Sequence, residues 1–273
     1  MILIHFGLTN YGFSLFVFLP FILGTILGDS LVKNISLYGL SISFGVFISL
    51  LLIGKLEGMV CILLALPIIF FFIALGFFIR YLLGRKQSQE KDKIKSTIAP
   101  YFIFLIISFS EKHIFGNDQE IIVVKTEMIL PYNSMQVYDA IKSVDTLIAE
   151  KPFLMKLDLP IPTKCILEKE EVGGLRTCHF SGGSITEKIT ELERGKLLKM
   201  DVIEYQLTGR KWLGFREAIY YFEKITADSS KITRVTTYSS ELKPRFYWEP
   251  LEKWAIAQEH EYVFENLKRD LGK

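Results

Sequence analysis

Charged residues are distributed very unevenly along this chain. The first 79 residues contain four of them, Asp29, Lys33, Lys55 and Glu57, and the other 58 of the chain's 62 charges lie in the remaining 194 residues. A charge in the hydrocarbon core of a bilayer costs several kcal/mol, so long uncharged runs of Leu, Ile and Phe are typical of membrane-spanning helices. The chain therefore divides into a part predicted to lie in lipid and a polar part predicted to fold in water.

Four apolar stretches are candidates for crossing the bilayer. A helix of about 20 residues covers the roughly 30 Å of hydrocarbon. The stretches at 11–28, 36–54 and 58–84 are close to this length or exceed it. A fourth stretch, at 97–110, is shorter and has Pro100 near its start, so it either crosses or lies flat at the interface. We predict a transmembrane region of three to four helices over residues 1–110.

Basic residues set the expected orientation of this integral membrane protein. The segment 80–95 carries six Lys and Arg side chains, and basic loops of this kind stay in the cytoplasm. Three spans precede it, so the N-terminus is expected outside, and the absence of an early basic residue argues against a cleaved signal peptide. If 97–110 crosses, the polar domain is extracytoplasmic, and if it lies flat, the domain is cytoplasmic. We favour crossing because adjoining Ser and Thr residues can extend the apolar run.

The polar part, residues 118–273, is long enough for one domain with its own core. It carries 23 basic and 25 acidic side chains, for a net charge of −2. Nucleic-acid binding requires a basic surface, so no nucleic-acid partner is expected. The four charged residues among the first 79 fall at predicted loop edges, which favours anchoring in the lipid bilayer over transport.

Alternation of apolar and polar residues predicts a sheet flanked by helices. A strand at 120–130 ends at Pro131, and Asn133 or Ser134 can cap a short helix after it. Glycines at 173–174, 182–183 and 195 lie between later apolar runs, where hairpin turns need positive φ. A final helix is expected from Trp248 to Leu271, with Pro250 in its first turn. The other expected strands cover 165–172, 175–181, 184–192, 197–205, 215–225 and 232–242.

The last helix is expected to cover the sheet. An antiparallel sheet cannot leave its apolar face bare. Ile256, His260, Val263 and Leu267 form one stripe at helical spacing and can meet that face. The expected fold class is α+β, a curved antiparallel sheet around a long C-terminal helix, preceded by transmembrane helices.

Several segments resemble the SRPBCC superfamily. They are GGLRTCHF at 173–180, ITEKIT at 185–190 and the Tyr247-Trp248 opening of the last helix, together with the order of the elements. The chain is also similar to bacterial membrane proteins that carry such a domain behind several spans, one of which opens with a string like EGMVCI at 57–62. The superfamily includes START-like and polyketide cyclase-like domains of the helix-grip fold. The resemblance implies an apolar cavity between sheet and helix for a lipid or other hydrophobic molecule.

No pattern typical of phosphate binding, metal binding or nucleophilic catalysis occurs. The four histidines have no ligand spacing with one another or with a cysteine, so no metal, cofactor or catalytic residue is assigned. If the strands turn at Gly173-Gly174, Cys165 and Cys178 lie four residues out of register, or about 13 Å apart at about 3.3 Å per residue. That is too far for a disulfide, so two buried free thiols are predicted.

The expected cavity residues come from the last helix and from aromatic-rich strands. A histidine in an apolar stripe, such as His260, is either a hydrogen-bonded core residue or a contact to the polar head of a ligand. Arg216 and Glu217 are neighbours on one strand, so only one of them can face the interior. The cavity candidates are His260, Ile256, Val263, Arg216, Tyr238, Trp248, Trp254 and Phe180.

Three functional hypotheses follow. The preferred one is a membrane-anchored domain that binds a hydrophobic or lipid-like small molecule. The second is a cyclase-like or hydrolase-like enzyme using His260 with Arg216 or Glu217 for acid–base chemistry, although no set of nucleophile and base is visible. The third is a ligand-sensing module that contacts a protein partner, which the sequence does not name.

Overall fold

The structure is a computed structural model that describes residues 11–29, 34–54, 57–84, 104, 106–111, 113, 120–207 and 212–272. The chain falls into two compact units. The apolar unit comprises Met1–Lys55, Cys61–Gln119 and Glu241–Trp248. The grip unit comprises Leu56–Val60, Glu120–Ser240 and Glu249–Lys273.

Helices make up the described part of the apolar unit. They are η1 (Ser14–Phe18), α2 (Leu19–Asp29), α3 (Asn34–Ile53) and α4 (Met59–Gly84), whose first two residues belong to the grip unit. Among the residues that the structure describes, one helix, Met59–Leu83, is long and apolar enough to cross a membrane. Two shorter apolar helical segments are Ser14–Gly28 and Phe44–Ile53, the second of which is part of α3. Much of the expected fourth span at 97–110 lies outside the described residues, and 106–111 are helical.

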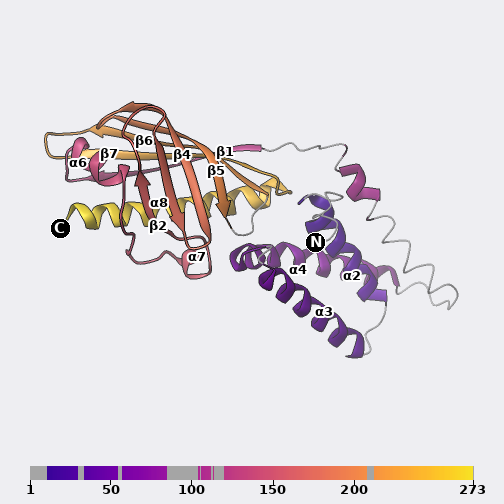
Figure 1. The fold of residues 1–273 in the computed structure, drawn as a ribbon. Coiled ribbons are helices and arrows are strands. Elements are labelled where there is room, and N and C mark those ends of the chain that lie inside the picture. Colours follow the sequence, from indigo (N-terminus) through magenta and orange to yellow (C-terminus); the bar gives the residue numbers. More distant parts are fainter. Residues whose placement is uncertain are drawn as a thin grey trace. The chain divides into compact units, whose positions relative to one another are not determined.

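The grip unit is a seven-stranded antiparallel sheet with strand order β1-β7-β6-β5-β4-β3-β2. In Figure 1 the sheet curves around the long helix α8 (Arg245–Leu271), which runs along its concave face. The predicted α+β helix-grip fold is confirmed for this unit. The strands are β1 (Glu120–Leu130), β2 (Pro162–Leu167), β3 (Leu175–Phe180), β4 (Gly183–Glu193), β5 (Leu197–Leu207), β6 (Leu213–Lys224) and β7 (Ser230–Ser240).

Two short helices connect β1 to β2. The first, α6 (Ser134–Lys142), begins with the capping box that Asn133 makes possible. The Asn133 side chain accepts from the Gln136 backbone N–H at 2.9 Å, and the Gln136 side chain accepts from the Asn133 N–H at 3.1 Å. The second helix, α7 (Phe153–Lys156), was not anticipated. The last helix begins at Arg245, three residues before the predicted start, so Pro250 lies inside it rather than in its first turn.

The prediction of free thiols at Cys165 and Cys178 was wrong. The two residues are directly opposite in the β2–β3 ladder and form a disulfide. The predicted strand 165–172 ends at Leu167, which pairs with Arg176, so the connection runs from Glu168 to Gly174. Gly173 and Gly174 do not form a tight two-residue turn, because their backbone groups bond to Ile189 of β4. This longer connection changes the register by four residues, which removes the predicted offset between Cys165 and Cys178.

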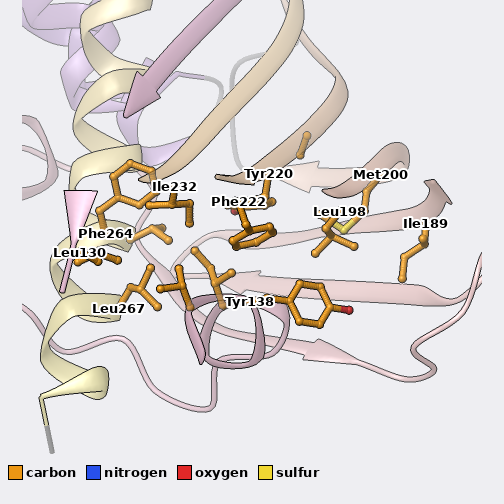
Figure 2. Close-up of a cluster of buried hydrophobic side chains, with 14 residues drawn as sticks. Leu130, Tyr138, Ile189, Leu198, Met200, Tyr220, Phe222, Ile232, Phe264 and Leu267 are labelled. Atoms are coloured by element: carbon orange, nitrogen blue, oxygen red, sulfur yellow. The ribbon is translucent and has the colours of Figure 1, made fainter. Parts of the chain in front are cut away.

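The core of the grip unit fills one end of the concave face. Figure 2 shows Phe264 and Leu267 of α8 near Leu130 and Ile232, with Tyr138 of α6 closing the cluster. Phe222, Leu198, Met200 and Ile189 continue this cluster across β6, β5 and β4, and each is at most 4% exposed. The half of the sheet covered by α6 and the end of α8 is therefore closely packed.

Candidate functional site

The other half of the concave face is packed less completely. Strand alternation carries the inward face from Met200 to Val202, and Val202 pairs with the buried Glu187 of β4. Phe215 pairs with Tyr238, which faces α8 because its hydroxyl donates to Glu252 at 3.3 Å. We call the partly exposed apolar residues of this region the open half. They are Phe180, Val202, Tyr205, Leu207 and Phe215 of the sheet and Ile256 of α8.

Strands β5 and β6 separate beside the open half. Their ladder joins Leu197–Asp201 to Glu217–Tyr221. Beyond this ladder, the described residues of β5 pair only with β4, and those of β6 pair only with β7. A bulge between Phe215 and Glu217 interrupts β6 at this point. The Tyr205 ring extends from β5 toward β6 and meets Phe215 edge-on, with 6.3 Å between ring centroids. Tyr205 is nevertheless 40% exposed, so the side chains do not seal this seam against water.

Two buried ion pairs lie on the inward face, and we call them the charge layer. Glu187 of this layer is opposite Val202 of the open half in the β4–β5 ladder. Arg176 and Glu187 form an ion pair at 2.8 Å, with side chains 3% and 8% exposed. Arg234 of β7 pairs with Glu259 of α8, also at 2.8 Å. Both guanidinium groups lie over the Tyr220 ring, at 5.8 and 5.5 Å from its centroid. Burial alone would lower the pKa of each arginine, but the facing glutamates outweigh it and raise both.

Arg176 also connects the sheet to α6. Its Nε donates to the Lys142 carbonyl at 3.0 Å and its second terminal nitrogen donates to the Ile141 carbonyl at 3.2 Å. These are carbonyls at the C-terminal end of α6, which helix geometry leaves without intrahelical partners. One buried guanidinium thus satisfies a carboxylate and the end of a helix.

His260 lies in the core rather than in the open half. It is fully buried, and its two ring nitrogens bond to the hydroxyls of Thr126 at 2.9 Å and Thr236 at 2.8 Å. Burial, with Arg234 nearby, lowers the pKa of His260 well below its usual value. A neutral imidazole with both nitrogens bonded is a structural hydrogen-bonding group, not an available base.

The lowered pKa of His260 makes stability depend on pH. Between the unfolded-state pKa of about 6.5 and the lower folded-state pKa, the unfolded chain binds a proton that the folded chain does not. We therefore expect the free energy of unfolding to decrease as pH falls below about 6.5, with a slope of up to about 1.4 kcal/mol per pH unit from this group. Urea unfolding at stepped pH measures the slope. His260→Gln should flatten it, and an unchanged slope in that variant would assign the effect to other groups.

The remaining cavity candidates are distributed over several environments. Val263 is buried in the core, and Tyr238 is buried beside α8. Trp248 belongs to the apolar unit, where its ring lies 4.8 Å from Phe16. Trp254 is 40% exposed. The structure therefore brings together only Phe180 and Ile256 of the eight candidates in the open half.

Arg216 and Glu217 do not meet His260. Arg216 is exposed at the bulge of β6. Glu217 is on the outward face, where it pairs with Lys199 at 3.3 Å. Since His260 is on the inward face, the acid–base set that the enzyme hypothesis required is not assembled. Among the described residues, no group of His, Cys, Asp and Glu side chains could hold a metal ion.

Sequence reasoning missed the charge layer, although a signal for it exists. Glu187 lies between Ile185 and Ile189 at a spacing of two, and Arg234 follows Ile232 at the same spacing. A charged residue in phase with the buried face of a strand must be paired. The spacing of two from buried isoleucines on β4 and β7 would therefore have identified Glu187 and Arg234 as buried, paired charges.

Comparisons with known proteins give matches among solved structures alone. No family model and no curated protein matches the chain. Similar structures include norcoclaurine synthase from Thalictrum flavum, with 17% identity over 55% of this chain and 88% of that chain and a TM-score of 0.36. Zhui aromatase/cyclase from Streptomyces sp. R1128 has 11% identity, covers 56% and 94%, and has a TM-score of 0.41. A START superfamily protein from Mycobacterium smegmatis has 9% identity, covers 55% and 97%, and has a TM-score of 0.41. One of these neighbours is an aromatase/cyclase and another is a START superfamily protein, and the helix-grip assignment of this chain rests on its own strand order and on α8.

Proposed function

We propose that the grip unit binds a hydrophobic small molecule against the open half. The supporting observation is that inward-facing apolar side chains there, Val202, Phe215 and Ile256 among them, remain in contact with water while the opposite end is closely packed. Covering such surface with an apolar molecule is favourable by roughly 25 cal/mol per Å². Ligand sites commonly combine apolar walls with a few fixed polar groups, and the charge layer would supply the latter.

Two valines on opposite faces of the sheet provide a test of this proposal. Val202 of β5 faces inward and Val123 of β1 faces outward with 53% exposure, so Val202→Asp should strongly reduce binding and Val123→Asp should not. The full-length protein in nanodiscs would be exposed to a diazirine-bearing long-chain alcohol and photolysed. Peptide mapping should place adducts on β5, β6 and the middle of α8. The proposal fails if the two variants label equally or if these peptides carry no adduct.

We further propose that the apolar unit anchors this binding domain in a membrane. The length and composition of α4 support this, since residues Met59–Leu83 could cross a bilayer. Close approach of α2 to α4 supports it as well. A Cβ at Gly24 would overlap the Ile73 carbonyl oxygen, and one at Gly76 would overlap that of Phe21. Small residues that let helix backbones approach are characteristic of helix packing in lipid.

Glu111 supports an extracytoplasmic position for the grip unit. Its carboxylate accepts from the backbone N–H of Phe13 at 2.6 Å and of Ser14 at 2.9 Å, and from the Ser14 hydroxyl. The end of the fourth apolar stretch would therefore lie on the same side of the membrane as the start of the first. Three spans precede the basic loop at 80–95, so a cytoplasmic loop puts the start of the first stretch outside, and the fourth stretch would then cross outward. The disulfide fits this side, because disulfides persist in oxidising compartments.

A further inference from the structure

An exposed aromatic pair lies on the grip unit where α7 meets α8. Phe153 and Trp254 stack with 6.4 Å between ring centroids and 22° between ring planes. They are nevertheless 60% and 40% exposed, so the pair presents apolar area outward instead of burying it. Pro250, one turn earlier on α8, is also exposed. We call these three residues the aromatic face.

The aromatic face is held rigidly. The Leu154 backbone N–H, beside Phe153, donates to the Gln258 side chain of α8 at 2.9 Å. Trp254 and Gln258 are one turn apart on the same side of α8, so this bond keeps α7 over Trp254. The exposure of the pair is thus fixed by packing and does not come from a loose chain end.

The same region of the grip unit includes the start of α4. Leu56–Val60 belong to this unit, and the Met59 backbone N–H donates to the Asp158 side chain at 3.5 Å. Asp158 follows α7 by two residues, and the Leu159 N–H returns to the Leu154 carbonyl at 3.0 Å. The segment that carries Phe153 is therefore beside the first residue of the helix proposed to enter the bilayer.

We propose that the aromatic face contacts the headgroup region of the bilayer that α4 enters. This inference rests on the proposed membrane anchor. Trp and other aromatic rings favour the membrane–water interface, where an apolar body meets lipid and a polar edge meets water. Two of the neighbouring lysines are ion-paired, Lys156 with Glu150 and Lys253 with Glu249, so the proposed contact rests mainly on the apolar rings. The grip unit would then be held against the lipid surface, and the open half would take up its ligand from there.

Tryptophan quenching by brominated lipids tests this contact. The chain has three tryptophans, and Trp212→Phe with Trp248→Phe leaves Trp254 alone in the full-length protein. In phosphatidylcholine nanodiscs we expect Trp254 to lose a large part of its emission to lipids brominated near the headgroup and less to lipids brominated deep in the chain. If the double variant does not fold, the emission of Trp254 is obtained as the difference between the wild-type protein and the Trp254→Phe variant, measured in the same brominated discs.

Two further probes separate failure of the contact from failure of the anchor. Tyr221 is 45% exposed on the outward face of β6, so Tyr221→Trp in a background without native tryptophans should escape quenching. Phe70 is 54% exposed within α4, so Phe70→Trp should be quenched by deep bromines. Quenching of the Phe70 probe with none of Trp254 would overturn the contact and leave the anchor standing. Absence of quenching at Phe70 would overturn the anchor.

Discussion

Replacing Arg176 with methionine is expected to lower the free energy of unfolding of the grip unit by about 3–5 kcal/mol. The change leaves the Glu187 carboxylate buried without its ion-pair partner, and it removes two donors from the carbonyls at the end of α6. An uncompensated buried charge is among the few single changes that cost this much. Urea unfolding of the full chain in detergent micelles, followed by near-ultraviolet circular dichroism, measures the loss.

Arg194 provides the matched control for burial. It also pairs with carboxylates, Glu170 at 2.6 Å and Asp139 at 3.5 Å, but its side chain is 56% exposed. Arg194→Met should therefore cost less than about 1 kcal/mol. Arg176→Met combined with Glu187→Leu should recover part of the stability, because the stranded carboxylate is gone. Equal losses in the two single variants would contradict the role given to the buried layer.

The order of elements was predictable because each strand carries its own signal. The β1 bounds 120–130 match the sequence prediction, since alternation begins and ends there and Pro131 stops the ladder. The Asn133 cap and the end of α8 at Leu271 were likewise predictable from local chemistry. These features depend on residues within one or two turns of each other, which is the range over which local patterns are reliable.

The open half and the charge layer depend on contacts that such patterns do not encode. The register between β2 and β3 depends on the length of the connection after Leu167. The Gly173-Gly174 pair suggested a shorter connection than the one observed. The separation of β5 from β6 and the bulge between Phe215 and Glu217 in the β6–β7 ladder are not predicted by any residue type there. His260 could be placed on the inward stripe from the sequence, but its two threonine partners come from β1 and β7. Long-range pairing therefore decided which candidates became core.

Removing the Cys165–Cys178 disulfide should lower the free energy of unfolding by about 3 kcal/mol, the loop-closure value for a separation of this order. The two cysteines are 13 residues apart in sequence and join β2, the edge strand, to β3. Replacing both with alanine therefore loosens the edge of the sheet that borders Phe180. Thermal unfolding of the full-length protein with and without a reductant measures the same quantity. Cys61→Ala is the control and should show little change, since Cys61 takes no part in this bond.

The oxidation state of these cysteines in intact cells also tests the proposed side of the membrane. Thiols would be blocked with N-ethylmaleimide in cells, and the denatured protein would then be reduced and treated with a polyethylene glycol maleimide. A disulfide formed in an oxidising compartment protects Cys165 and Cys178 from the first reagent, so two adducts should appear only after reduction. The Cys165→Ala variant should lose both, because its remaining Cys178 thiol is blocked at the first step. Complete blocking of the wild-type thiols in cells would mean that they are reduced there, and would place the grip unit on the cytoplasmic side.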